Sequence, residues 1–175
     1  MNRALALPLA VVLAAATVAS TASFAVKAGS ARGPTQPVHY SHQIHAGKLG
    51  MNCLYCHYGA DKSPVANLPP VGVCMGCHRI ARADKPEIMK LAAYFERGEP
   101  VPWVEVNFLP AYVRFNHERH VRADLQCTGC HGPVPQMEVM YQYPSLKMGW
   151  CVGCHRRYLN HRQFPASMDC LICHH

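Results

Sequence analysis

The sequence predicts a mostly helical and loop-rich fold with little regular structure, preceded by one N-terminal transmembrane helix. Three observations support this prediction: cysteine-containing motifs that recur along the chain, one stretch with a clear helical pattern, and an uncharged apolar segment at the start. The 175 residues are enough for one ordinary domain. The formal net charge of +7 includes no run of five basic residues, which argues against a nucleic-acid-binding arm.

Residues 1–28 are predicted to form a signal-anchor. Ala4 to Val26 contains no charged side chain, and as a helix it would reach roughly 35 Å at about 1.5 Å per residue, enough to cross a bilayer core. The alternative is a cleaved export signal, because small residues lie between Ser20 and Ala25. Either interpretation exports the rest of the chain. We expect a single-pass protein of the cytoplasmic membrane, with a linker at 29–37 and the main domain on the periplasmic side.

One segment further along has the pattern of an amphipathic helix. Asp84 is suited to cap it, Pro86 suits its first turn, and Gly98 ends it. The apolar face of this helix is predicted to consist of Ile88, Leu91, Ala92 and Phe95. The segment that follows, 101–107, is expected to be an extended connector or a short strand.

All ten cysteines fall into one pattern, Cys-x-x-Cys-His, which is typical of c-type haem attachment. The two thiols add to the haem vinyl groups, and the adjacent histidine becomes the proximal ligand of the iron. Zinc sites and thioredoxin-type motifs also use Cys-x-x-Cys, but neither requires a histidine directly after it. The sequence therefore predicts five covalently bound c-type haems. In chain order, motifs 1 to 5 are Cys53/Cys56/His57, Cys74/Cys77/His78, Cys127/Cys130/His131, Cys151/Cys154/His155 and Cys170/Cys173/His174.

An internal repeat organises these motifs. Residues 38–45 match residues 113–120, and two motifs follow each copy. We therefore expect a haem domain at 38–175, made of two-haem units at 38–98 and 113–160 and a fifth haem at 161–175. So short a chain cannot build a large side-chain core, and the haems are expected to serve as the core.

The repeat also nominates distal haem ligands. Each copy contains His-x-x-His, and on a helical turn residues three apart project to the same side. Each iron has one remaining axial place, so the two rings of a pair must serve two different haems. The four candidates are His42, His45, His117 and His120. The fifth distal ligand stays open among His161, Met148, Met140, His175 and His39. A methionine ligand would raise the potential of its haem.

These segments resemble multihaem class III cytochromes of the cytochrome c3 and c7 group. They more closely resemble the ActA-type pentahaem cytochrome c subunits of alternative complex III. The resemblance covers about residues 36–157 and is carried by residues 37–47, 53–58, 73–78, 115–121 and 148–156.

The resemblance implies an electron-transfer subunit that is not catalytic alone. Its partners would be an iron–sulfur molybdoenzyme-like subunit, polytopic quinol-binding membrane subunits and a monohaem cytochrome c subunit. It would relay electrons from quinol oxidation to a soluble cytochrome c or a blue-copper protein. The alternatives are a small membrane-anchored quinol dehydrogenase that feeds a periplasmic reductase, and a multihaem enzyme with an open iron. Because Ala4 to Val26 contains no ionisable side chain to take a proton, we expect that this chain alone does not oxidise quinol.

Overall fold

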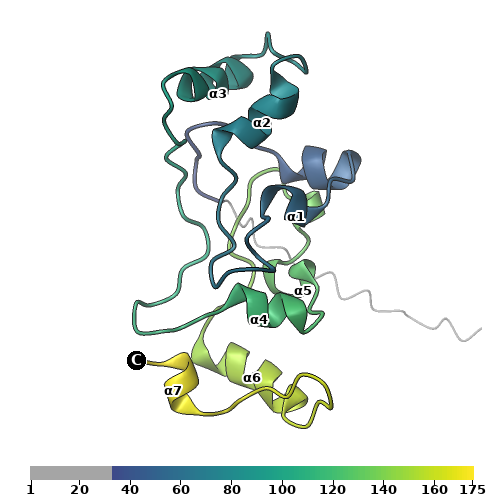
Figure 1. The fold of residues 1–175 in the computed structure, drawn as a ribbon, viewed down its shortest axis with the longest axis vertical. Coiled ribbons are helices and arrows are strands. Elements are labelled where there is room, and N and C mark those ends of the chain that lie inside the picture. The colour runs from purple at the N-terminus through teal and green to yellow at the C-terminus, as the bar shows by residue number, and fades with distance from the viewer. Residues whose placement is uncertain (1–32) are drawn as a thin grey trace, which may run out of the picture.

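The computed structural model describes residues 33–175 (Figure 1). The predicted signal-anchor at 1–28 lies outside the described residues. Within 33–175 the chain consists of short helices and loops with no named strand, as the sequence predicts. No helix in this range is long and apolar enough to cross a membrane.

Every Cys-x-x-Cys-His motif places its cysteines on a helix. Asn52 and Asp169 begin two of these helices, and their side chains accept hydrogen bonds from backbone N–H groups of the first turn. The helices between residues 33 and 175 are η1 (a π-helix, Gln43–Lys48), α1 (Cys53–Cys56), α2 (Val71–His78), α3 (Pro86–Glu96), α4 (His117–Arg122), α5 (Cys127–His131), η2 (a 3₁₀ helix, Val134–Gln136), α6 (Met148–Tyr158) and α7 (Cys170–Cys173).

Helix α3 confirms the predicted amphipathic helix, with a correction at its start. Lys85, not Asp84, is the N-cap residue, and the Asp84 carboxylate instead pairs with Lys85 Nζ at 3.0 Å. Leu91 is the buried residue of the apolar face. The helix ends at Glu96 with Arg97 as its C-cap, and Gly98 follows with a φ of +66° that glycine tolerates without steric cost.

The segment 101–107 is extended but forms no strand, so the strand alternative is wrong. Val101 is buried and Trp103 packs beside it, which ties the segment to the core rather than to a sheet. The one β-bridge among residues 33–175 joins Val113 to His174 instead.

The side-chain core is small and lies at one end of the molecule. It consists of Val38, Met75, Leu91 and Val101, and it is centred where α2 packs on α3. Helices α5, α6 and α7 contain no buried residue. The half of the described chain that carries motifs 3 to 5 therefore has almost no apolar core of its own.

The motif helices follow one another along the long axis of the molecule. Figure 1 shows α2 and α3 at one end, α1 and then α5 in the middle, and α6 and α7 at the end that carries the C-terminus. This order differs from the order in sequence, because motif 2 lies outside motif 1.

Candidate functional site

The two His-x-x-His segments, which we name the first ligand turn (41–45) and the second ligand turn (116–120), begin in the same way. Ser41 Oγ accepts a hydrogen bond from the backbone N–H of Ile44 at 3.2 Å. Asn116 Oδ1 accepts the equivalent bond from Arg119 at 3.1 Å. Serine and asparagine are both good capping residues, so each copy starts its helical turn at the residue before the first histidine.

One aromatic ring holds both histidines of each turn. Tyr40 stacks on the ring of His45 at 4.5 Å between centroids and meets His42 edge-on at 4.9 Å. Phe115 makes the same two contacts with the equivalent histidines of the second turn, at 4.5 and 4.8 Å. The aromatic residue fixes the two imidazoles at a large angle to each other, so they point to different places.

The two copies hold each other. The backbone N–H of Gln43 in the first turn donates to Met137 O at 2.9 Å, beyond motif 3. At the equivalent position in the second turn, the backbone N–H of Glu118 donates to Ser63 O at 3.2 Å, beyond motif 1. Each ligand turn is thus anchored by the loop that follows the first motif of the other copy.

Three proximal histidines face a histidine of a ligand turn. With metal–nitrogen bonds of about 2 Å, two imidazoles on opposite sides of one metal have ring centres roughly 6 Å apart. The observed centroid distances match this spacing: His45 to His78 at 6.0 Å, His120 to His155 at 6.1 Å, and His117 to His131 at 6.3 Å. The angles between the ring planes in these pairs are 65°, 42° and 4° respectively.

Hydrogen bonds to backbone carbonyls set the tautomer of most of these rings. A carbonyl can only accept, so the imidazole Nδ1 must carry the proton and Nε2 keeps its lone pair for a metal. Six rings have this arrangement: His45 to Ser41 O at 2.9 Å, His57 to Asn67 O at 2.9 Å, His78 to Ala81 O at 2.8 Å, His117 to Pro64 O at 3.1 Å, His120 to Asn116 O at 2.7 Å and His155 to Ser167 O at 2.6 Å.

His42 and His131 differ from these six. The Nδ1 atom of each is buried and has no hydrogen-bond partner among residues 33–175. Burial lowers the pKa of His42 to about 4, and His57 lowers it more than any other side chain does. Burial also lowers the pKa of His131, followed by the charge of His117. Both rings are therefore held in the neutral form that binds metals.

His161 has the opposite arrangement. Its Nδ1 accepts a hydrogen bond from the backbone N–H of Phe164 at 3.0 Å. A neutral ring that accepts at Nδ1 carries its proton on Nε2, so it does not offer that nitrogen to a metal. The structure does not bring His161 into a pair with any proximal histidine among residues 33–175.

The other candidates for the fifth distal ligand lie in varied surroundings. His39 Nε2 is 3.6 Å from Glu138 Oε1, the backbone N–H of His175 donates to Tyr112 O at 3.3 Å, and Met148 is 65% exposed. Met140 is half-buried. His174 of motif 5 stacks on the Tyr112 ring at 5.9 Å and meets no histidine ring among residues 33–175. The fifth pair therefore stays open.

The thiols of neighbouring motifs lie close enough to influence one another. Burial raises the pKa of several of them, and the next contributions come from cysteines of other motifs. The neighbouring thiols are Cys74 and Cys56, Cys127 and Cys53, Cys130 and Cys154, and Cys151 and Cys173. These contacts agree with the order of helices in Figure 1 and place the motifs in the single file 2–1–3–4–5.

Cys77 differs in exposure from the second cysteine of every other motif. In motifs 1, 3, 4 and 5 the second cysteine is half-buried, whereas Cys77, the second cysteine of motif 2, is exposed. Its motif partner Cys74 packs against the small core, and Cys77 lies nearly one helical turn further along α2. The second thiol of motif 2 therefore lies past the core and faces solvent.

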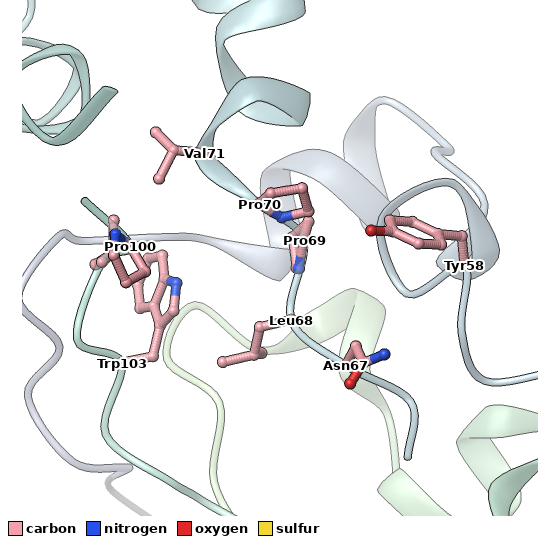
Figure 2. A pocket seen from close by; sticks show the side chains of 9 residues that line it. Tyr58, Asn67, Leu68, Pro69, Pro70, Val71, Pro100 and Trp103 are labelled. Atoms are coloured by element: carbon pink, nitrogen blue, oxygen red, sulfur yellow. The ribbon is translucent and has the colours of Figure 1, made fainter. Parts of the chain in front are cut away.

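A pocket of about 420 Å³ lies beside the loop between motifs 1 and 2 (Figure 2). Tyr58, Pro69, Pro70 and Trp103 give it flat apolar walls, and Asn67 lies at its edge. No motif cysteine or histidine lines it. The pocket thus lies beside Asn67, whose carbonyl oxygen is the partner of His57 Nδ1, but none of its lining residues is a candidate haem ligand.

The comparisons with known proteins agree with this chemistry. Residues 113–175 match the family model described as cytochrome c7 and related cytochrome c, a range that contains the second ligand turn and motifs 3 to 5. Over 160 residues the chain is 26% identical to the menaquinone reductase, multiheme cytochrome c subunit, of Nitratidesulfovibrio vulgaris (strain Hildenborough). This similarity covers 79% of the chain and 76% of that protein.

The site and the similarities define a class. Residues 113–175 form a cytochrome c7-like multihaem cytochrome domain, and the chain as a whole is similar to a multihaem cytochrome c subunit, a class that transfers electrons. The residues present fit c-type haem, since free thiol pairs lie beside histidine pairs spaced for one iron.

Sequence reasoning missed the aromatic residues Tyr40 and Phe115 and the carbonyl acceptors. A signal for the aromatic residues was available, because they occupy equivalent positions in the repeat.

Proposed function

We propose that this chain carries five covalent c-type haems and relays electrons between a membrane quinone-oxidoreductase complex and periplasmic redox proteins. The observation that supports this most strongly is the set of histidine pairs at 6.0 to 6.3 Å, which suits irons with both axial places filled. Each haem supplies an iron that cycles between the ferric and ferrous states. Filled axial places at motifs 2, 3 and 4 favour a relay there over an enzyme that needs an open iron.

In this proposal the proximal ligands are the motif histidines and the ligand turns supply four distal ligands. The remaining pair, His42/His57, is assigned from the repeat. His42 and His57 occupy in the first copy the places that His117 and His131 occupy in the second. The proposed axial pairs are His42/His57, His45/His78, His117/His131 and His120/His155, with His174 as the proximal ligand of motif 5.

The proposed partners are those of an alternative complex III. They are an iron–sulfur molybdoenzyme-like subunit, polytopic quinol-binding subunits and a monohaem cytochrome c subunit, with a soluble cytochrome c or blue-copper protein as acceptor. Two facts support a link to the quinone pool: the motifs that resemble this family, and the similarity to a menaquinone reductase subunit. The signal-anchor at 1–28 would hold the haem domain on the periplasmic side of the cytoplasmic membrane.

The favoured direction of electron flow is from quinol to the periplasmic acceptor. One quinol would lose two electrons and two protons at the membrane subunits, and the two electrons would reduce two ferric irons of this chain. The name of the relative favours a second candidate, in which a periplasmic donor reduces this chain and the electrons then reduce menaquinone. The residues described above serve either direction, because they fill axial places and line up the motifs.

The test starts from native membranes. A pyridine haemochrome assay should give five haems per chain, and thiol reagents should label no cysteine of the denatured holoprotein, the exposed Cys77 included. In stopped-flow measurements menaquinol should reduce the haems of the purified complex, while the isolated full-length chain should be reduced only by dithionite. Rapid reduction of the isolated chain by menaquinol would overturn the relay and favour the anchored quinol dehydrogenase. Haem reduction by a periplasmic donor followed by menaquinone reduction would favour the second candidate.

A further inference from the structure

The four histidine pairs differ in how their outer ring nitrogens are bonded. In two pairs, His45/His78 and His120/His155, both Nδ1 atoms lie within 2.6 to 2.9 Å of a backbone carbonyl oxygen. We name these the fully anchored pairs. The half-anchored pairs, His42/His57 and His117/His131, each have one Nδ1 on a carbonyl and one that is buried without a partner among residues 33–175.

The difference follows from how each ring is held. His45 and His120 donate to the carbonyl four residues earlier in their own turn, so the helical turn itself supplies the acceptor. His117 instead depends on Pro64 O, which reaches it from the other copy of the repeat. His42 has no such carbonyl, although the chain brings Met137 O to the N–H of the next residue.

This bonding acts on the iron. An N–H that donates to a carbonyl gives the imidazole partial negative charge and makes it a stronger electron donor. A stronger donor stabilises the ferric state and lowers the reduction potential, whereas a ligand without that bond leaves the potential higher. Burial at the unpartnered positions adds to the difference, because a low-dielectric setting disfavours the extra positive charge of the ferric form.

We infer that the half-anchored pairs hold irons of higher potential than the fully anchored pairs, so that electrons collect in the middle of the molecule. This inference rests on the proposed axial pairs. The half-anchored pairs belong to motifs 1 and 3, whose helices α1 and α5 are neighbours in Figure 1 and whose Cys53 and Cys127 thiols adjoin. Motifs 2 and 4, with the fully anchored pairs, flank them on either side.

The arrangement suits exchange between a two-electron carrier and one-electron carriers. Two adjacent central irons can each take one electron, ferric becoming ferrous, so both electrons of one quinol can be stored together. The flanking irons of lower potential then pass these electrons on singly. The residues assigned to this storage role are the axial histidines without a carbonyl partner, His42 and His131.

The test is an EPR-monitored potentiometric titration of the isolated full-length holoprotein. Nearly parallel imidazole planes split the iron d orbitals strongly and give a rhombic low-spin signal, while nearly perpendicular planes give a signal with a large g maximum. The angle of 4° in His117/His131 predicts the rhombic signal, and the angle of 65° in His45/His78 predicts the large g maximum. On reduction, the rhombic signal should disappear at a higher potential than the large-g signal. The reverse order would overturn the inference.

A matched set of variants assigns the signals independently. His42→Met and His117→Met should each raise the reduction potential of one haem that already belongs to the higher-potential group. His45→Met and His120→Met should each raise the potential of one haem in the lower-potential group. Equal starting potentials for the two groups would contradict the inference. Because the titration needs no partner protein, a failed menaquinol assay would reject the relay and leave this ordering measurable.

Discussion

The first and second ligand turns share the capping, aromatic and i−4 contacts that aim the imidazoles, but differ in how each turn is tied to the rest of the molecule. Both have a capping side chain, an aromatic ring between the two histidines and an Nδ1 bond four residues back. The entry to each turn differs. The backbone N–H of His39 donates to the Glu87 carboxylate at 2.7 Å, whereas that of Arg114 donates to the Cys173 carbonyl at 2.7 Å.

The difference separates two requirements. Placing two imidazoles on two irons is a strict geometric demand, and the two copies meet it with the same capping side chain, aromatic ring and Nδ1 bond four residues back. Anchoring the turn is a looser demand that a charged side chain from α3 or a backbone carbonyl beside α7 can meet. We therefore expect equivalent substitutions inside the turns to have equal effects, and substitutions in the anchors to have unequal ones.

The largest expected effect comes from removing an imidazole that faces a proximal histidine. His45→Ala and His120→Ala should each convert one low-spin haem to high spin and destabilise the chain by about 4 kcal/mol, the scale of losing a metal crosslink. Optical spectra and denaturant unfolding of the holoprotein measure both effects.

The matched control is His161→Ala, because its Nδ1 accepts a hydrogen bond and its ring faces no proximal histidine among residues 33–175. This variant should keep every low-spin signal. Unequal results for His45→Ala and His120→Ala would break the proposed equivalence of the two turns, whereas a high-spin haem in His161→Ala would make His161 the fifth distal ligand.

The next effect concerns the aromatic ring in each turn. Tyr40→Ala and Phe115→Ala should each lower the free energy of unfolding by about 2 kcal/mol, less than for a fully buried aromatic because both rings are partly exposed. Thermal unfolding monitored at the haem bands would measure the loss. A loss in only one copy would show that the ring is structural in that copy alone.

Much of this site could be predicted from the sequence, and the limits have physical reasons. The Cys-x-x-Cys-His spacing fixes the chemistry of attachment, and the repeated His-x-x-His spacing nominates the histidines of the two ligand turns. The partners of the rings depend on non-local contacts, such as that between His117 and Pro64 O, which no local pattern encodes.

Two further differences have the same kind of cause. Asp84 is a good capping residue by type, yet the chain starts α3 one residue later. Cys77 carries the same motif position as four half-buried cysteines, yet it is exposed. Exposure depends on what packs around each motif in the fold, and the sequence repeat does not contain that information. The N-terminal segment, 1–28, stays a prediction.

The anchors of the two turns should differ in their response to acid. The Lys90 side chain and then the His39 N–H hold the pKa of Glu87 below its usual value. Its charged form therefore stabilises the folded state above about pH 4.5, and this contribution is lost as the pH falls through the lowered pKa. The tie between Arg114 and Cys173 involves only backbone atoms and does not titrate.

Glu87→Gln should weaken the first copy at neutral pH and flatten the loss of stability below pH 4.5. The control is Glu118→Gln in the second turn, whose carboxylate pairs with Arg122 at 3.2 Å but anchors no turn. Unfolding midpoints measured from about pH 7 to about pH 3 would separate the two variants. An acid response in Glu87→Gln as steep as that of the unsubstituted protein would mean that the anchor is not electrostatic.

The smallest effect should come from making the first copy resemble the second. Tyr40→Phe removes only a hydroxyl, and Phe115 shows that the second turn aims its histidines without one. Burial raises the pKa of Tyr40 to about 12, with the Cys56 and Cys74 thiols adding to the shift, so the hydroxyl stays neutral at working pH. We expect a change within about 0.5 kcal/mol, and unchanged low-spin spectra. If the variant instead altered the haems of motifs 1 and 2, the hydroxyl would have a role in the first copy that the second copy lacks. The two turns would then differ in the contacts within each turn as well as in their anchors.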